Sequence, residues 1–354
     1  MNDILPLTGS NSILFVGGGS IGHIAPSVAV AKILKQQFPS LICRFVCGTR
    51  PEDALFIEKN GFSATPLGAP RLSVGFPWKF WSAYGKARAM LIEEKPRVIF
   101  SKGGYVSVPV CLAAKKLGIP IILHESDAVS GWANWLVGRW AEKICLGFEG
   151  SLKNPKAVFI GNPVAASVTE GSRQKGVALT GLSRMRPILL VLGGSQGSLA
   201  INQAIAHGLF TLLGIVDVIH VTGEGKRTVE GKIEGYWQCP FAYEEYPHLF
   251  AAADIALSRA GAGTIAELAA NGLPTILVPL KGAAHNHQEK NARLAAQSGG
   301  CVVIDQRELL EKITETVRTI LEPPTYELMR KKMRTLHRSD ATRQIADLLA
   351  GYLA

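Results

Sequence analysis

The chain has 354 residues, of which 47% are hydrophobic and 19% are charged. This balance excludes a disordered chain, and the Gly and Cys counts exclude collagen-like and disulfide-scaffold proteins. Because the length exceeds what one hydrophobic core ordinarily spans, we expect two domains.

The net charge is unevenly distributed along the chain. In total, 38 Lys and Arg stand against 28 Asp and Glu, a formal charge of +10. Residues 1–163 carry 18 basic and 10 acidic side chains, and residues 164–354 carry 20 and 18. The basic first half favours an anionic partner, either a membrane surface or a nucleic acid, and uniform solubilising charge is the alternative.

Six scattered cysteines form no Cys-x-x-Cys pair, which disfavours a zinc ribbon or a thioredoxin-type redox site. We expect buried, reduced thiols and a cytoplasmic location. The first residues lack the basic start of a signal peptide, and no apolar run reaches the ~18 residues that span a bilayer. Contact with a membrane from the cytoplasmic side stays open.

Short apolar runs alternate with helical patterns along the first half. A glycine-rich turn follows the first run and precedes a helix near 26–37. The predicted strands are 12–16, 43–47, 98–101, 121–124, 143–146 and 157–160. This alternation predicts a parallel sheet flanked by helices.

The pattern restarts after the turn signal Gly161-Asn162-Pro163. A strand at 187–192, a glycine-rich segment and a helix at 199–213 precede strands at 217–221, 255–258 and 275–279. We therefore predict an α/β protein of two Rossmann-like domains whose parallel sheets face each other across a cleft. The predicted domains are 1–163 and 164–354, with the last helix able to pack back on the first; residues 326–354 are expected to be helical, with a solvated basic face.

The segment from Gly17 to His23 reads Gly-Gly-Gly-Ser-Ile-Gly-His and fits GxGxxG between a strand and a helix. Such a loop lets backbone amides at a helix N-terminus approach a phosphate, so Ser20, Ile21 and Gly22 are candidate binding residues. His23 lies where the loop enters the helix. It is a candidate functional side chain, with a hydrogen bond at the helix start as the alternative.

A dinucleotide site would place an acidic residue about 20 positions after such a loop. The next predicted strand instead ends Cys47-Gly48-Thr49-Arg50, without a carboxylate. NAD is therefore disfavoured, and NADP held by Arg50 remains a minor alternative.

The second glycine-rich segment, Gly193-Gly194-Ser195-Gln196-Gly197-Ser198, repeats the anion-binding pattern with Ser195 at its centre. It has no Lys after the last Gly, which excludes a Walker A site. In the segment 258–267, the amides of Ala262, Gly263 and Thr264 are suited to a diphosphate, and Glu267 is suited to two ribose hydroxyls. Thr264-x-x-Glu267 also fits a capping box, and both interpretations can hold.

Downstream, Gln288 and Asn291 offer amides suited to sugar hydroxyls, with a polar helix start as the alternative. Together these segments resemble the lipid II-forming N-acetylglucosaminyltransferases of bacterial peptidoglycan synthesis, members of glycosyltransferase family 28 with the GT-B fold. The matching blocks, in family order, are Gly18–His23 with Pro26, Gly103–Ser107 with Pro109, His124-Glu125, Gly161-Asn162-Pro163, Gly193–Gly197, Arg259–Glu267, Gly272-Leu273-Pro274 and His287–Ala292.

The resemblance implies that the C-terminal domain binds UDP-N-acetylglucosamine. Tyr243 would lie at the uracil, Ser195 and the amides of 262–264 at the diphosphate, Glu267 at the ribose, and Gln288 and Asn291 at the sugar. The N-terminal domain would hold lipid I, the membrane-anchored acceptor. The resemblance also implies a peripheral enzyme on the cytoplasmic face of the bacterial membrane, with roles in cell-wall synthesis, cell shape and division, and membership of a cell-wall synthesis complex.

Three segments depart from the family pattern. The family loop usually reads Gly-Gly-Thr-Gly-Gly-His, whereas Ser20 and Ile21 replace Thr and Gly here. The usual His-Glu-Gln-Asn ends in Ser126-Asp127, which places a carboxylate near an anionic substrate, and Ala165 replaces an arginine. These changes indicate a diverged member with an altered acceptor contact, with an inactive member as the alternative.

Residues 59–92 contain no Asp or Glu and interleave basic with aromatic side chains. This composition suits an anionic lipid interface. We expect some rings, such as Phe80 and Tyr84, to pack inward. The side chains expected to face the membrane are Arg71, Trp78, Lys79, Trp81, Lys86 and Arg88.

For the reaction implied by the resemblance, the 4-hydroxyl of the muramic acid attacks the anomeric carbon of the donor with inversion. His23 is our first candidate for the general base, and Glu125 is the second. Loop amides can stabilise the leaving UDP, and the chain contains no Asp-x-Asp, so no metal or other cofactor is expected to be obligatory.

Other functions remain open at this stage. The alternatives are a glycosyltransferase of the same fold with another lipid acceptor such as diacylglycerol, a nucleotide-sugar epimerase, and a non-catalytic protein that binds a nucleotide sugar or a nucleic acid. The sequence contains no recognised nucleic-acid module, so nucleic acid is not expected as a partner.

Overall fold

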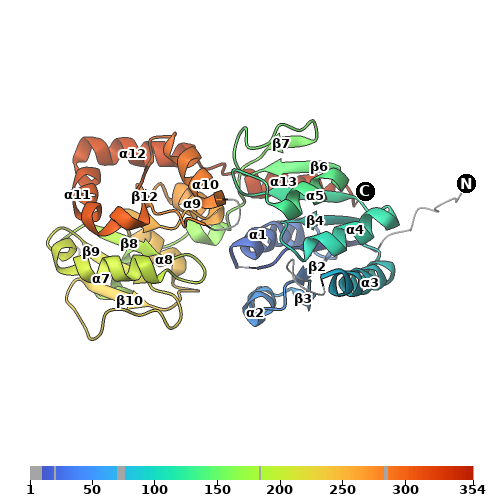
Figure 1. The fold of residues 1–354 in the computed structure, drawn as a ribbon, viewed down its shortest axis with the longest axis horizontal. Helices are drawn as coiled ribbons and strands as arrows, with labels where there is room; N and C mark the ends of the chain where they lie inside the picture. The colour runs from blue at the N-terminus through green and yellow to red at the C-terminus, as the bar shows by residue number, and fades with distance from the viewer. Residues whose placement is uncertain (1–9, 20, 70–75, 183–184, 283–285, 354) are drawn as a thin grey trace, which may run out of the picture. The chain divides into compact units, whose positions relative to one another are not determined.

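The computed structural model describes residues 10–19, 21–69, 76–182, 185–282 and 286–353. These residues divide into two compact units. One comprises residues up to Pro163 together with Asp340 onwards, and the other comprises Val164–Ser339. Each contains one parallel sheet flanked by helices, which confirms the predicted fold class of two parallel-sheet α/β domains (Figure 1).

The first unit has a seven-stranded sheet in the order β3-β2-β1-β4-β5-β6-β7. Its strands are β1 Ser12–Val16, β2 Ile42–Cys47, β3 Ser63–Pro66, β4 Val98–Ser101, β5 Ile121–Glu125, β6 Lys143–Leu146 and β7 Ala157–Phe159. Its helices are α1 Ile21–Gln37, α2 Pro51–Lys59, α3 Phe76–Glu94, α4 Ser107–Leu117, α5 Trp132–Trp140 and α13 Ala341–Ala350.

The second unit has a six-stranded sheet in the order β10-β9-β8-β11-β12-β13. Its strands are β8 Ile188–Leu192, β9 Asp217–Val221, β10 Tyr236–Cys239, β11 Ile255–Ser258, β12 Thr275–Leu277 and β13 Cys301–Val303. Its helices are α6 Arg173–Thr180, α7 Leu199–Leu213, α8 Tyr246–Ala252, α9 Ala262–Asn271, α10 His287–Ala296, α11 Leu309–Leu321 and α12 Pro323–Thr335, with short 3-10 turns at Ala166–Thr169 (η1) and Gln306–Glu308 (η3).

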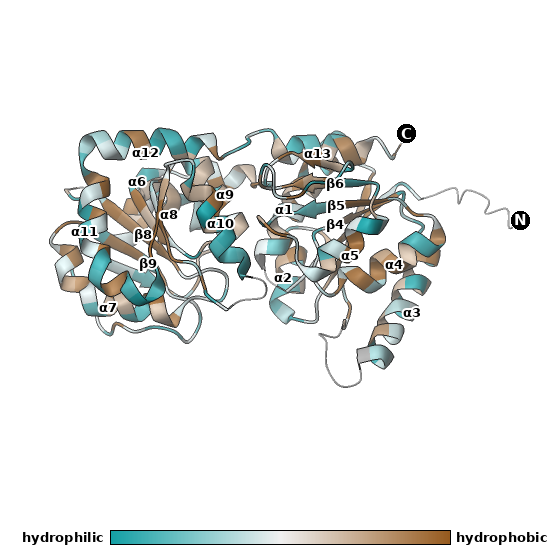
Figure 2. Ribbon diagram, turned by 45° about the horizontal axis from the view of Figure 1, so that its top comes forward, coloured by the Kyte–Doolittle hydropathy of each residue, from teal (hydrophilic) through white to brown (hydrophobic). Residues whose placement is uncertain are grey.

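The central strands are apolar on both faces because helices cover both faces of each sheet. Along β1, Ile13 and Phe15 enter one hydrophobic cluster, and Leu14 and Val16 enter another. In the second unit, Figure 2 shows β8, all of whose residues are buried, in the brown of hydrophobic residues. The first cluster includes Ile345 of α13, so the final helix completes the core of the first unit.

Three sequence predictions need correction. The first helix begins at Ile21 rather than near Pro26, because Pro26 is tolerated inside α1. The predicted helical tail is two helices, α12 in the second unit and α13 in the first, separated by residues 336–340. The strands β3, β10 and β13 were not predicted; all three lie at sheet edges and lack a long apolar run.

The cysteines are mostly buried, as predicted. All six are free, and all are buried except Cys239, which is half-buried; the set is Cys43, Cys47, Cys111, Cys145, Cys239 and Cys301. In the part of the chain that the structure describes, no helix has the length and hydropathy needed to cross a bilayer.

Candidate functional site

The second unit presents its ligand-binding features at the carboxyl edge of its sheet, where sites in such folds form. The neighbouring strands β8 and β11 are each followed by a loop and a helix. Residues 193–198 form the first of these loops. Gly197 has φ +69°, and a Cβ there would lie 2.2 Å from the carbonyl oxygen of Thr222, so only glycine fits this contact. Ser195 is exposed at the middle of the loop.

The second loop leads into α9, which begins at Ala262. Gly261 is the N-cap, and no side chain caps the helix. The first amides of α9 therefore have no intrahelical partner, as an anion site requires; they include those of Gly263 and Thr264. The capping-box interpretation of Thr264 and Glu267 is wrong, because Thr264 lies within the first turn rather than before it.

Glu267 is instead oriented by Tyr246, whose hydroxyl donates to Glu267 Oε2 at 3.1 Å. Burial raises the pKa of Glu267 to about 7. Tyr246 also links this carboxylate to Tyr243, because the Tyr246 amide donates to the Tyr243 carbonyl at 3.3 Å. The ring of Tyr243 is half exposed beside Phe241, with 6.2 Å between ring centroids.

The two amide residues predicted to contact the sugar lie on α10. Gln288 accepts from the Leu280 amide at 3.0 Å. Asn291 is fully buried, and its Nδ2 donates to the Ala260 carbonyl at 3.1 Å, so it holds the loop before α9. Sugar binding by either side chain stays a prediction.

In the first unit, the loop after β1 is held by hydrogen bonds to side chains of the same unit. The Gly19 amide donates to Asp53 Oδ2 at 3.2 Å, and Arg50 Nη1 donates to the Gly19 carbonyl at 2.8 Å. Asp53 is fully buried on α2 and was missed at the sequence level because it lies beyond the end of β2. In this structure Arg50 therefore stabilises the loop after β1 through its hydrogen bond to Gly19.

The predicted residues of this loop fall at the start of α1. Ile21 and Gly22 are its first two residues, and His23 is half-buried in its first turn. Ser20 lies outside the described residues, and so does Arg71 of the predicted membrane surface.

Glu125 lies at the carboxyl end of β5 and is 2% exposed. Asn134 Nδ2 donates to Glu125 Oε2 at 2.9 Å, and the Asp127 amide donates to Glu125 Oε1 at 3.2 Å. Burial raises the pKa of Glu125 to about 7, although the bond from Asn134 opposes this change. Gly103 makes room for Asn134, because a Cβ at Gly103 would lie 1.9 Å from Asn134 Oδ1.

Lys102 joins the same buried cluster and was also missed. Its Nζ contacts His124 Nδ1 at 2.8 Å and donates to Ser126 Oγ. His124 Nε2 lies 2.9 Å from the Gly161 carbonyl, which requires a proton on Nε2 and leaves Nδ1 to accept from Lys102. Burial lowers the pKa of Lys102 to about 7, while the charges of Glu125 and Asp127 raise it. The carboxylate at Asp127 therefore has a nearby cation.

The only sequence signal for Lys102 is a charged residue directly after a buried strand, in Ser101-Lys102-Gly103-Gly104. Asn134 had no signal, because it contacts Glu125 only after α5 has folded back. Among the described residues, no group of three or more His, Cys, Asp or Glu is placed to hold a metal ion.

Helix α3 carries all the predicted membrane-facing side chains except Arg71. Its inner face is formed by Ala83, Ala87 and Leu91, which are buried. Trp78 is 85% exposed and Trp81 is 59% exposed. The cations of this helix, Lys79, Lys86 and Arg88, are exposed, while Phe80 and Tyr84 are half-buried.

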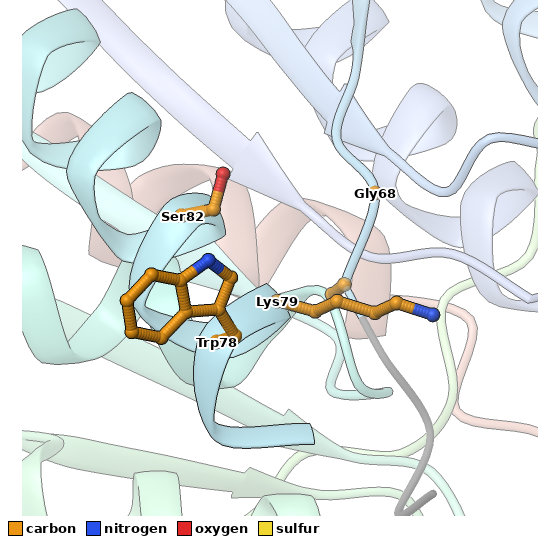
Figure 3. A pocket seen from close by; sticks show the side chains of 5 residues that line it. Gly68, Trp78, Lys79 and Ser82 are labelled. Atoms are coloured by element: carbon orange, nitrogen blue, oxygen red, sulfur yellow. The ribbon is translucent and has the colours of Figure 1, made fainter. Parts of the chain in front are cut away.

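A shallow, open pocket lies at the start of α3 (Figure 3). Trp78, Lys79 and Ser82 line it together with Gly68 and Ala69, which follow β3. The Trp78 and Lys79 side chains extend in different directions from the helix. This segment therefore exposes rings and cations together.

The raised pKa of Glu125 predicts a pH dependence of stability. Between about pH 4.5 and 7, the folded state keeps a proton that the unfolded state has lost, so stability falls as pH rises. Glu125→Gln lacks this titration, so its free energy of unfolding should rise relative to that of the wild type by up to about 3 kcal/mol between pH 4.5 and 7. Urea unfolding of both proteins at several pH values measures the difference. Glu93→Gln, which removes an exposed carboxylate on α3, is the matched control. A difference that stays constant from pH 4.5 to 7 would contradict the prediction.

Comparison with known proteins identifies the family of this chain. The glycosyltransferase family 28 N-terminal domain matches residues 13–146, and the family 28 C-terminal domain matches residues 188–348. A relative from Lachnoclostridium phytofermentans is named UDP-N-acetylglucosamine--N-acetylmuramyl-(pentapeptide) pyrophosphoryl-undecaprenol N-acetylglucosamine transferase. It is 36% identical over 350 residues, which cover 95% of this chain and 98% of the relative.

Two solved structures share the fold. MurG of Acinetobacter baumannii has a TM-score of 0.75 at 23% identity, covering 96% of this chain and 99% of the other. The UDP-GlcNAc 2-epimerase of Neisseria meningitidis, bound to UDP-GlcNAc, has a TM-score of 0.69 at 14% identity, covering 96% and 100%. At these identities the structures support the fold alone. The two domain matches and the 36% identity across nearly the full length show that this chain belongs to glycosyltransferase family 28.

Proposed function

We propose that this enzyme transfers N-acetylglucosamine from UDP-N-acetylglucosamine to the 4-hydroxyl of N-acetylmuramic acid in undecaprenyl-pyrophosphoryl-MurNAc-pentapeptide, forming lipid II. The observation that carries this assignment is the nearly full-length match to a relative of that named activity. The fold alone would not distinguish a transferase from an epimerase, since both share it.

The donor is assigned to the second unit. Uncapped amides at the start of α9 suit the diphosphate, and the exposed Ser195 loop adjoins them through the paired strands β8 and β11. Glu267, oriented by Tyr246, suits the ribose hydroxyls, and Tyr243 suits the uracil. The α9 amides and the Ser195 loop stabilise the negative charge on UDP as it leaves, and the proposal requires no metal ion for this step.

The acceptor and the base are assigned to the first unit. The acceptor hydroxyl attacks the anomeric carbon, the bond from that carbon to the diphosphate oxygen breaks, and the configuration inverts. The base takes the hydroxyl proton as the new bond forms. His23 is the first candidate because an imidazole titrates near neutral pH, and Glu125 is the second.

A transfer assay tests the assignment. With radiolabelled UDP-N-acetylglucosamine and a lipid I analogue, we expect label in the lipid product and release of one UDP for each sugar transferred. Label in diacylglycerol only, epimerised nucleotide sugar, or binding of the donor without any product would each contradict the proposal.

Replacement of His23 tests the base. We expect His23→Ala to lower turnover by about 100-fold or more while leaving the affinity for UDP nearly unchanged, because a general base contributes to the chemical step alone. Single-turnover kinetics and UDP titration measure the two quantities. His207→Ala, at an exposed histidine on α7, is the control. An equal loss of turnover and UDP affinity would assign His23 to binding or folding.

We further propose that α3 attaches the enzyme to the cytoplasmic face of the membrane, where its lipid acceptor lies. The exposed Trp78 and Trp81 suit the headgroup region, and the neighbouring Lys79, Lys86 and Arg88 suit anionic lipids. Arg71 is assigned to the same surface from the sequence.

Charge reversal tests this surface. Each cation near an anionic membrane contributes about 1 kcal/mol, so we expect Lys79→Glu with Lys86→Glu to weaken binding at least about tenfold. Co-sedimentation with vesicles of phosphatidylglycerol and phosphatidylcholine measures this. Lys331→Glu with Lys332→Glu, on exposed positions of α12, is the matched control. Unchanged co-sedimentation of the α3 variant would contradict membrane attachment through α3.

A further inference from the structure

Arg259 follows β11 directly and is 7% exposed. Its guanidinium contacts three neutral oxygen atoms. Nη1 donates to the Val278 carbonyl at 3.1 Å, and Nη2 donates to Ser198 Oγ and to Gln306 Oε1, each at 2.6 Å. These bonds give the N–H groups of the Arg259 guanidinium acceptors, but because the acceptors are neutral they leave its positive charge uncompensated.

No carboxylate of a described residue lies within 4 Å of this guanidinium. The nearest acidic residue along the chain from Gln306 is Asp305, which pairs with Lys281. Glu267, on the helix that follows Arg259, is bound to Tyr246. By contrast, Arg186 of the same unit pairs with the buried Asp217 at 2.8 Å.

A buried charge is costly to desolvate unless an opposite charge faces it. Burial lowers the pKa of Arg259. A guanidinium nevertheless keeps its proton inside proteins, so an arginine does not escape this cost by becoming neutral. The cost is recovered if the opposite charge arrives with a ligand. The surroundings of Arg259 therefore favour an anion as its missing counter-charge.

The position of Arg259 identifies where that anion would bind. Its Cβ lies 3.9 Å from the place that a Cβ on Gly194 would occupy, and its amide donates to the Leu192 carbonyl at 3.3 Å. Ser198, which its guanidinium contacts, is the N-cap of α7. The loop before α9 follows immediately in the sequence. Arg259 thus lies beneath both glycine-rich loops of the second unit.

We propose that Arg259 is the built-in counter-charge of the donor diphosphate: a buried cation that attracts the phosphates through the field it adds beneath the two loops. This inference rests on the proposed function, because it takes the donor to be a UDP-sugar. Arg259 acts without leaving the protein interior. Its contribution is specific to the charged part of the ligand, whereas a purely structural arginine would support nucleoside and nucleotide binding equally.

The test compares UDP with uridine, which lacks the phosphates. For Arg259→Gln we expect the affinity for UDP to fall about tenfold to a hundredfold and the affinity for uridine to stay within about twofold. Arg259→Lys, which keeps the charge, should restore most of the UDP affinity. Calorimetric or NMR titration of the full chain measures both ligands.

Gln306→Glu provides a variant that is expected to fold. It places a carboxylate where Gln306 Oε1 already accepts from Arg259, so the melting temperature without ligand should not fall. The affinity for UDP should nevertheless drop about tenfold, since the cation is now neutralised, and uridine should bind as before. The matched control is Arg186→Gln, which breaks an ion pair at the opposite edge of the sheet. It should lower stability and leave the ratio of UDP to uridine affinity unchanged.

Equal weakening of UDP and uridine in Arg259→Gln would overturn the inference, and so would unchanged UDP binding in Gln306→Glu. In both cases the wild type still binds UDP and the proposed function stands. Failure of the wild type to bind UDP at all would instead overturn the proposed function.

Discussion

Both units have to place charged side chains at the end of a parallel sheet whose central strands are buried, and this constraint shapes both of them. The carboxyl edge is where ligands bind in such folds, yet the strands that lead to it are buried on both faces. The first unit meets the constraint internally, because Lys102 lies near Glu125 and Asp127. The second unit leaves Arg259 among neutral acceptors. The two units thus differ in where the compensating charge comes from.

The loops at the start of α1 and α9 also differ in whether their backbone amides already have a partner within the protein. In the first unit, the Gly19 amide is already engaged by the buried carboxylate of Asp53. In the second, α9 begins with no side-chain cap, so its first amides remain for a ligand. The loop after β1 and the loop before α9 therefore have different capacities for phosphate. The difference favours the second unit as the nucleotide-binding half, in agreement with the role that we propose for it.

The sequence predicted the central strands, the two-domain division of the fold and the glycine-rich loops well, because long apolar runs and glycine spacing are local signals. It did not predict the edge strands β3, β10 and β13. These strands are short, mix polar with apolar residues, and are stabilised by pairing with a neighbouring strand. It also missed Asp53, Lys102 and Asn134. Each acquires its role through a contact with a residue distant in the sequence, which no local pattern records.

The buried environment of Glu125 also bears on the choice of base. Its two oxygens already accept from Asn134 and from the Asp127 amide, and the residue is 2% exposed. A proton acceptor has to reach the substrate hydroxyl within hydrogen-bond distance, which for Glu125 would require these contacts to rearrange. His23 is only half-buried, in the first turn of α1. We therefore propose His23, rather than Glu125, as the group that meets the hydroxyl, and we propose that Glu125 holds the segment from His124 to Asp127 in place.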